Sequence, residues 1–293
     1  MLYGIPEAST ELGWDIGLPL LLALVLFALA VPIWVSLGFA AIGLLVMTDV
    51  LPLTLFGESL FSGIDTFALI AIPLFILTGD VLVRSGLSGK LLDVAEATMG
   101  SLRSGFGTST VLGCGFFACI SGSDAAGAAA VGRITHGRLV EVGYPRPYAA
   151  ALVASGACTG ILIPPSIAYI IIGLVLGISA STLFLAAAVP GVMIMVSIMI
   201  TNVVLNRING FERSDVRFDF NRWLQAVWDG KFALMIPFII LGGIYTGVFT
   251  PTEAAAVAVT EAAAAAIRGA GDPRRIGESP PKIEHKILVL RNL

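Results

Sequence analysis

Ser121-Gly-Ser-Asp-Ala-Ala-Gly127 and Gly160-Ile-Leu-Ile-Pro-Pro-Ser166 interrupt the long apolar run between Gly113 and Gly191, and these interruptions decide the fold. Inside a bilayer, irregular backbone is tolerated only where protein buries it or where it lines a wet cavity, because lipid cannot hydrogen-bond the freed N–H and C=O groups. Secondary transporters build their ion and substrate sites from helices broken at membrane depth. The two interruptions therefore predict such a site.

The composition predicts an all-α polytopic membrane protein. Hydrophobic residues make up 57% of the 293 residues and charged residues 13%, against roughly 25% charged residues in an ordinary soluble domain. The lipid bilayer must therefore surround most of the chain. The net charge of -3 provides no basic surface, which excludes binding to nucleic acid.

Cysteine and histidine give little basis for a cofactor. The three cysteines lie in apolar segments at spacings that match no metal-ligand pattern, and the two histidines are far apart. We predict no bound cofactor and no metal centre built on these residues. Ile120-Ser121-Gly122 superficially resembles an intramembrane serine protease with His136 as its base, but His136 lies in a charged loop. We therefore predict that the chain is not an enzyme.

The first interruption is expected at the tip of a re-entrant hairpin. Gly105–Cys119 and Ala125–Thr135 are each too short to cross a bilayer, and the interruption lies between them. The flanking segments Arg84–Arg103 and Arg133–Arg146 both carry excess positive charge, which places both ends of the hairpin on one side.

The hairpin tip contains the first candidate site residues, Ser121, Gly122, Ser123 and Asp124. A helix beginning at Ala125 would point its positive end at an anionic group of a substrate. Carbonyl groups that end the preceding helix, together with the hydroxyls of Ser121 and Ser123, suit Na⁺. The alternative is that Ser123 or Asp124 only caps a helix in an interfacial loop.

The second interruption is expected to break a helix that runs from about Tyr148 to Leu176. Two consecutive prolines remove two backbone donors and disfavour helix before them. The candidate site residues here are Gly160, Pro164, Pro165 and Ser166. A plain kink or a short loop between two membrane spans is the alternative.

The rest of the chain supplies further predicted elements. The apolar run 17–47 forms either two short spans or one kinked long span, and its acidic N-terminal flank predicts an N-terminus facing away from the cytoplasm. Residues 66–83 and 183–205 are expected to span, residues 84–104 to form a loop, residues 206–231 to include an amphipathic interfacial helix, and residues 233–248 to span again. Thr250-Pro-Thr-Glu253 is a capping box that opens one more helix.

Residues 15–259 contain a series of short motifs. In chain order they are Gly63-Ile-Asp-Thr-Phe67, Ala71-Ile-Pro-Leu-Phe-Ile76, Ile120-Ser-Gly-Ser123, Ala128-Ala-Ala-Val-Gly132, Gly143-Tyr144, Tyr148-Ala-Ala-Ala151, Ile163-Pro-Pro-Ser-Ile167, Leu183-Phe184, Pro190-Gly191, Gly242-Gly-Ile-Tyr245 and Phe249-Thr-Pro-Thr-Glu-Ala-Ala-Ala256. Together these motifs resemble the large permease subunit of tripartite ATP-independent periplasmic (TRAP) transporters, the DctM type.

The resemblance implies an elevator-type transporter whose mobile part consists of two inverted repeats, each with one re-entrant hairpin and one broken helix. It implies import of small organic acids such as C4-dicarboxylates or sugar acids, with Na⁺ as the coupling ion, across the bacterial cytoplasmic (inner) membrane. The implied partners are a small four-helix membrane subunit of the DctQ type and a periplasmic binding protein of the DctP type. Residues 121–124 and 160–166 would belong to the first repeat, near one Na⁺ site.

The sequence departs from this family in two ways. Position 124 is usually small or hydroxylated, and here it is Asp, which either adds a cation ligand or marks a divergent copy. After Val259 nothing repeats the first motif, and residues 260–293 are expected to be a polar tail outside the family. A truncated gene, a frameshift or a split permease would each explain this, and we expect no transport by this chain alone. The alternative function is a membrane scaffold or interaction protein that transports nothing.

Overall fold

The computed structural model describes residues 12–48, 53–102, 104–212 and 219–270, and these residues form helices and no β-strand. The chain divides into two compact units, which meet in the sequence between Thr66 and Phe67. The first unit contains α1 (Leu12–Ala28), α2 (Ile33–Thr48) and α3 (Leu53–Ile64). The chain turns at Ala30, which has a φ of 59°, and α1 packs against α2. The first apolar run therefore forms two short helices rather than one long one.

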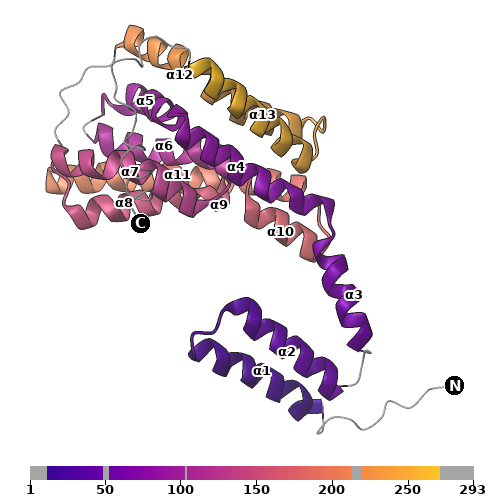
Figure 1. Cartoon of the computed structure of the whole chain (residues 1–293). Coiled ribbons are helices and arrows are strands. Elements are labelled where there is room, and N and C mark those ends of the chain that lie inside the picture. The colour runs from indigo at the N-terminus through magenta and orange to yellow at the C-terminus, as the bar shows by residue number, and fades with distance from the viewer. Residues whose placement is uncertain (1–11, 49–52, 103, 213–218, 271–293) are drawn as a thin grey trace, which may run out of the picture. The chain divides into compact units, whose positions relative to one another are not determined.

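The second unit holds both predicted interruptions (Figure 1). Its elements are η1 (Phe67–Ile70), α4 (Ala71–Arg84), α5 (Leu87–Met99), α6 (Gly105–Ser121), α7 (Asp124–Val142), α8 (Arg146–Ala157), α9 (Thr159–Leu162), α10 (Ile167–Leu176), α11 (Ala180–Asn209), α12 (Phe220–Tyr245) and α13 (Pro251–Ala270). The first interruption is the turn between α6 and α7, which pack against each other as a helical hairpin. The second is the break between α9 and α10.

Helix length and surface composition fit a multi-pass membrane protein. Within the described part of the chain, four helical segments are long and apolar enough to cross a bilayer, namely Phe67–Arg84, Arg146–Leu176, Ala180–Asn209 and Phe220–Tyr245. Large apolar side chains on these segments are exposed, among them Val175 (75%), Met193 (67%) and Phe238 (75%). Such an extensive apolar surface would aggregate in water, so lipid is its natural solvent.

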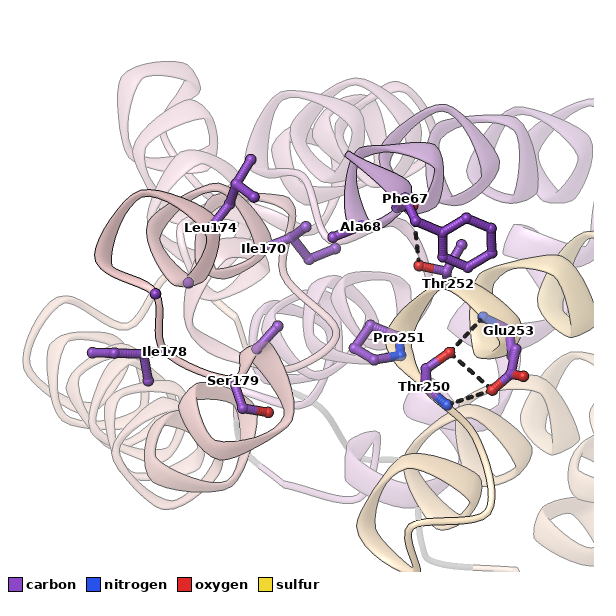
Figure 2. Close-up of a pocket in the computed structure, with 13 residues that line it drawn as sticks. Phe67, Ala68, Ile170, Leu174, Ile178, Ser179, Thr250, Pro251, Thr252 and Glu253 are labelled. Carbon is purple, nitrogen blue, oxygen red and sulfur yellow. Dashed lines mark hydrogen bonds between the residues drawn. The ribbon is translucent and has the colours of Figure 1, made fainter. Parts of the chain in front are cut away.

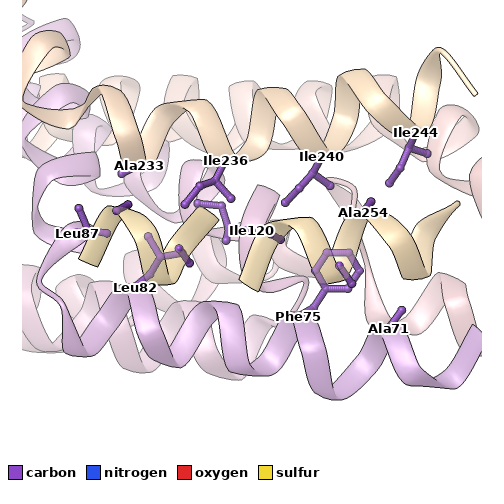
Figure 3. Close-up of a cluster of buried hydrophobic side chains, with 14 of the residues drawn as sticks. Ala71, Phe75, Leu82, Leu87, Ile120, Ala233, Ile236, Ile240, Ile244 and Ala254 are labelled. Atoms are coloured by element: carbon purple, nitrogen blue, oxygen red, sulfur yellow. The ribbon is translucent and has the colours of Figure 1, made fainter. Parts of the chain in front are cut away.

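Helices α4, α12 and α13 pack around one buried apolar cluster (Figure 3). Phe75 and Leu82 of α4 face Ile236 and Ile240 of α12, and all four side chains are almost fully buried. Helix α13 contributes small residues, because Ala254, Ala255, Ala258, Ala262 and Ala265 form its buried face. Small residues let helix backbones approach closely, which is how membrane helices associate when lipid removes the hydrophobic drive.

Two predictions for the second unit were wrong. Residues 84–104 are mostly the helix α5, not a loop, and the interfacial segment and the following span are parts of the continuous helix α12. Gly230 lies near the join between these two predicted elements, and α12 continues through it. An added Cβ at Gly230 would lie 3.1 Å from Val94 Cγ2, so glycine lets α12 approach α5 closely. Residues 213–218 and 271–293, which include most of the predicted polar tail, lie outside the described residues.

The close packing of α13 can be tested with two alanines of one helix. Ala258 is 1% exposed and belongs to the buried cluster, whereas Ala256 is exposed. We expect Ala258→Leu to lower the free energy of unfolding by about 1 to 3 kcal/mol through overpacking, and Ala256→Leu to change it by less than about 0.5 kcal/mol. Unfolding of the purified protein in detergent measures both. Equal effects would show that α13 is not packed through this face.

Candidate functional site

The turn between α6 and α7 is formed by two capping residues. Gly122 ends α6 with a left-handed backbone (φ 60°), and its N–H donates to the Ala118 carbonyl oxygen (3.0 Å). Ser123 is the N-cap of α7, and its Oγ accepts a hydrogen bond from the Ala126 N–H (3.4 Å). The Ser123 N–H in turn points to the Ser121 Oγ, 3.5 Å away. Both serine hydroxyls therefore lie at the junction of two helix ends.

This hairpin tip contacts the break between α9 and α10. The Ile167 N–H donates to the Gly122 carbonyl oxygen (3.3 Å), which joins the tip directly to the start of α10. A Cβ at Gly122 would lie 2.6 Å from the Pro165 carbonyl oxygen, and one at Gly160 would lie 2.9 Å from Asp124 Oδ1. The two segments that the sequence predicted to form one site are therefore in contact, and glycine at both positions allows it.

Two buried oxygen atoms at this contact have no hydrogen-bond partner among the described residues: Asp124 Oδ1 and Ser166 Oγ. Ser166 is fully buried at the N-cap of α10, and Asp124 lies in the first turn of α7. Buried polar atoms almost always have a partner, and buried charges are normally paired or bind a cation. These oxygens can therefore accept a donor or coordinate a cation.

The ligands available here are oxygen atoms. In the described residues no three or more His, Cys, Asp or Glu side chains lie together as a metal cluster. Ser121 (1% exposed), Ser123, Ser166 and Asp124 supply three hydroxyls and one carboxylate. The last carbonyls of α6 also lack intrahelical partners, as at any helix end. Hydroxyl and carbonyl oxygens at discontinuous helices are the groups that bind Na⁺ in transporters.

A separate pocket of about 470 Å³ lies where η1, the end of α10 and the start of α13 meet (Figure 2). Its lining is mainly apolar and contains none of the eight predicted site residues. The predicted capping box is present at its edge: Glu253 Oε2 accepts from the N–H and the hydroxyl of Thr250, each at 2.8 Å. One oxygen of this carboxylate therefore already serves as a cap at the start of α13.

Sequence reasoning missed one contributor to the site, Gly79 of α4. An added Cβ at Gly79 would lie 3.1 Å from Ser121 Cβ, so the absence of a side chain lets α4 cover the end of α6. Gly79 lies within an apolar helix, and nothing in its local pattern distinguishes it from a packing residue. Only the three-dimensional contact identifies its role.

Comparison with known proteins gives a family match over most of the chain. Residues 20–269 match the family model described as "Tripartite ATP-independent periplasmic transporter, DctM component". The isethionate TRAP transporter permease protein DctMQ of Oleidesulfovibrio alaskensis is 39% identical over 78% of this chain and 36% of its own length.

Two other relatives are named for different substrates. The C4-dicarboxylate TRAP transporter large permease protein DctM of Pseudomonas aeruginosa is 38% identical over 71% of this chain and 48% of its own length. The ectoine TRAP transporter large permease protein TeaC of Halomonas elongata is 36% identical over 69% of this chain and 47% of its own length. The chain thus spans half or less of the length of these three relatives.

The contact between tip and break can be tested at Gly122, with Gly177 as the matched control. Both residues are left-handed (φ 60° and 67°), but an added Cβ at Gly177 would have no atom within 4 Å. Gly177→Ala should cost only the backbone strain, about 1 to 2 kcal/mol. Gly122→Ala should lower the free energy of unfolding by at least about 1 kcal/mol more, because its methyl group also pushes the hairpin tip away from the Pro165 carbonyl oxygen. Equal losses of unfolding free energy would rule out the contact.

Proposed function

The chain belongs to the DctM component family of tripartite ATP-independent periplasmic transporters, and from this premise we propose that it forms part of a Na⁺-coupled permease for small organic acids. It is a multi-pass membrane protein of a transporter family whose relatives are permeases. In the proposed mechanism, α6 and α7 form the re-entrant hairpin and α8–α10 the broken helix of one inverted repeat. An elevator-type movement of this repeat carries the bound ion and substrate across the membrane.

One observation supports the Na⁺ site: the hairpin tip and the helix break meet, and two of their buried oxygens have no hydrogen-bond partner in the described part of the chain. Ser121 and Ser123 present hydroxyls beside the end of α6, and Ser166 presents one at the start of α10. A Na⁺ ion between these groups would satisfy oxygens that otherwise cost free energy when buried. Asp124 adds a formal negative charge, which would strengthen cation binding at short range.

The distribution of arginine supports one orientation of the second unit in the inner membrane. Arg84 ends α4, Arg146 begins α8 and Arg207 lies in the last turn of α11. Because cytoplasmic loops are enriched in Lys and Arg, these three helix ends belong on the cytoplasmic side. The start of α4 and the turn between α10 and α11 then face the periplasm.

The proposed substrates are small organic acids delivered by a periplasmic binding protein, with a small membrane subunit as the second partner. The relatives are named for isethionate, C4-dicarboxylates and ectoine, so the family handles several small polar molecules. In this chain, the N-terminus of α7 offers N–H groups and a positive dipole end to an anionic group. With Na⁺ balancing the carboxylate of Asp124 in the same turn, this helix end favours an acid over a cationic substrate, and it does not select one acid.

Sodium binding provides the first test, because it does not require transport. We expect Na⁺, compared with K⁺ at the same concentration, to stabilise the purified protein, since a ligand at 100 times its Kd adds about 2.7 kcal/mol. Replacing both Ser121 and Ser123 by Ala, or Asp124 by Asn, should remove most of this difference. Ser155→Ala, at an exposed serine of α8, is the matched control. A Na⁺ effect that survives in the serine double variant would refute the proposed site.

Uptake provides the test of function. The assay uses proteoliposomes with the chain, the small subunit, the binding protein and the remaining length supplied from a relative. We expect sodium-dependent accumulation of an organic acid, and weaker sodium dependence in the Ser121→Ala, Ser123→Ala double variant. Sodium-stimulated binding without any accumulation by the assembled complex would favour the non-transporting scaffold instead.

A further inference from the structure

Glu212, which follows α11, places its carboxylate at the start of α6. Glu212 is only 5% exposed. Its carboxylate accepts hydrogen bonds from the N–H groups of Phe106 (2.8 Å) and Gly107 (3.3 Å), which lie more than one hundred positions earlier in the chain. The N-cap residue of α6, Ser104, makes no side-chain cap bond. Glu212 therefore caps α6 from a distant part of the chain, and its charge complements the helix dipole.

The backbone of Glu212 is held as firmly as its side chain. The Glu212 N–H donates to Asn206 Oδ1 (2.8 Å), and Asn206 Nδ2 donates to the Glu212 carbonyl oxygen (3.0 Å). Asn206 lies in the last turn of α11 and is 3% exposed. Gly210, with a φ of 66°, turns the chain back between them. The end of α11 thereby directs the carboxylate toward α6.

A third segment joins the same carboxylate. Tyr144, in the turn between α7 and α8, donates its hydroxyl to Glu212 Oε2 (3.0 Å). Burial, and then the negative charge of Glu212, raise the pKa of Tyr144, so the phenol keeps the proton that it donates. A Cβ at Gly107 would lie 2.5 Å from the Tyr144 hydroxyl oxygen, so glycine is needed where these segments meet.

No arginine or lysine of the described residues forms an ion pair with Glu212. Arg138 is close, with its guanidinium 4.4 Å from the centre of the Phe106 ring, but its salt bridge is to Glu96 (3.2 Å). Among the described residues, the Glu212 carboxylate accepts hydrogen bonds from two amides at the start of α6 and from one phenol in the turn between α7 and α8. Losing any of them would leave a buried carboxylate short of donors, which is costly.

We propose that Glu212 is a clasp that fixes the end of α11 to the open end of the α6–α7 hairpin and to the turn between α7 and α8, so that these elements move together. This inference rests on the proposed transport function, because a clasp between helices affects a movement only in a protein that moves.

Glu212 acts as a positioning residue and not as a ligand. It binds α6 at Phe106, whereas the hairpin tip lies at the other end of α6, at Ser121. At a rise of about 1.5 Å per residue, the two ends are roughly 22 Å apart. The clasp can therefore affect how far the hairpin moves with α11 without touching the bound ion or substrate.

Hydrogen–deuterium exchange of the full chain in lipid nanodiscs tests the clasp whether or not the protein transports. In Glu212→Gln, we expect exchange at the Phe106 and Gly107 amides to rise about tenfold or more. The reason is that the charge-assisted hydrogen bonds to the carboxylate are lost, and the NH₂ group of the glutamine faces a backbone N–H, so that two donors meet. Exchange in residues 206–212 should rise with it. Tyr144→Phe should give a smaller rise at the same places, and Glu141→Gln, at an exposed glutamate of α7, should give none.

Two results of the exchange experiment would overturn the proposal: unchanged exchange at Phe106 and Gly107, or a rise there without one in residues 206–212. Exchange in peptides from α13 reports on general unfolding. If Glu212→Gln raises exchange in α13 as well, the exchange measured in Tyr144→Phe alone decides whether the clasp exists. In the assembled transporter, Glu212→Gln should lower kcat several-fold and leave KM for Na⁺ and substrate unchanged. A raised KM would assign Glu212 to binding and refute the clasp, while absence of uptake by the wild type would count only against the transport function.

Discussion

The backbone groups that are freed at each helix break must find partners inside the protein, because the lipid around this chain offers none. The described structure meets this requirement with a different device at each end. The Gly122 carbonyl accepts from the Ile167 N–H, Ser123 caps α7, Glu212 caps α6 from a distance, and Thr250 with Glu253 caps α13. Two of these arrangements, the bond from Ile167 to Gly122 and the cap by Glu212, join separate segments of the chain. The same hydrogen bonds that satisfy the backbone therefore also fix the hairpin against the broken helix and against α11.

Close approach of backbones follows from that requirement. The hairpin tip can reach the break only because positions 122 and 160 carry no side chain, and α4 can cover Ser121 only because position 79 is glycine. The alanine face of α13 serves the same purpose against α4. Small residues in this chain therefore mark the places where helix backbones approach closely, and many of the large apolar residues outside the buried clusters are exposed.

The sequence predicted those features that depend on neighbouring residues. The capping box of α13, the turn at residues 121–124 and the break at Pro164-Pro165 have local causes: side-chain caps, glycine and missing donors. The bond between Glu212 and Phe106 has no local signal, since the sequence shows a glutamate in a polar connector and says nothing of the distant helix start that it caps. The continuity of α12 was missed because the amphipathic pattern up to residue 231 and the apolar run from residue 233 differ in composition, although one helix carries both. The assignment of Na⁺ and substrate to the site residues stays a prediction.

The packing of α13 on α4 also has a consequence for the order of assembly during synthesis. The Thr252 hydroxyl donates to the Phe67 carbonyl oxygen, 185 positions earlier in the chain, and the buried alanines of α13 complete the surface of α4. At about 5 to 20 residues per second, the ribosome needs roughly 10 to 40 s to make that stretch. For this time α4 waits in the membrane with Ala71, Phe75 and Leu82 uncovered by their final neighbour. The nascent chain therefore presents lipids or insertion chaperones with a surface that the finished protein hides.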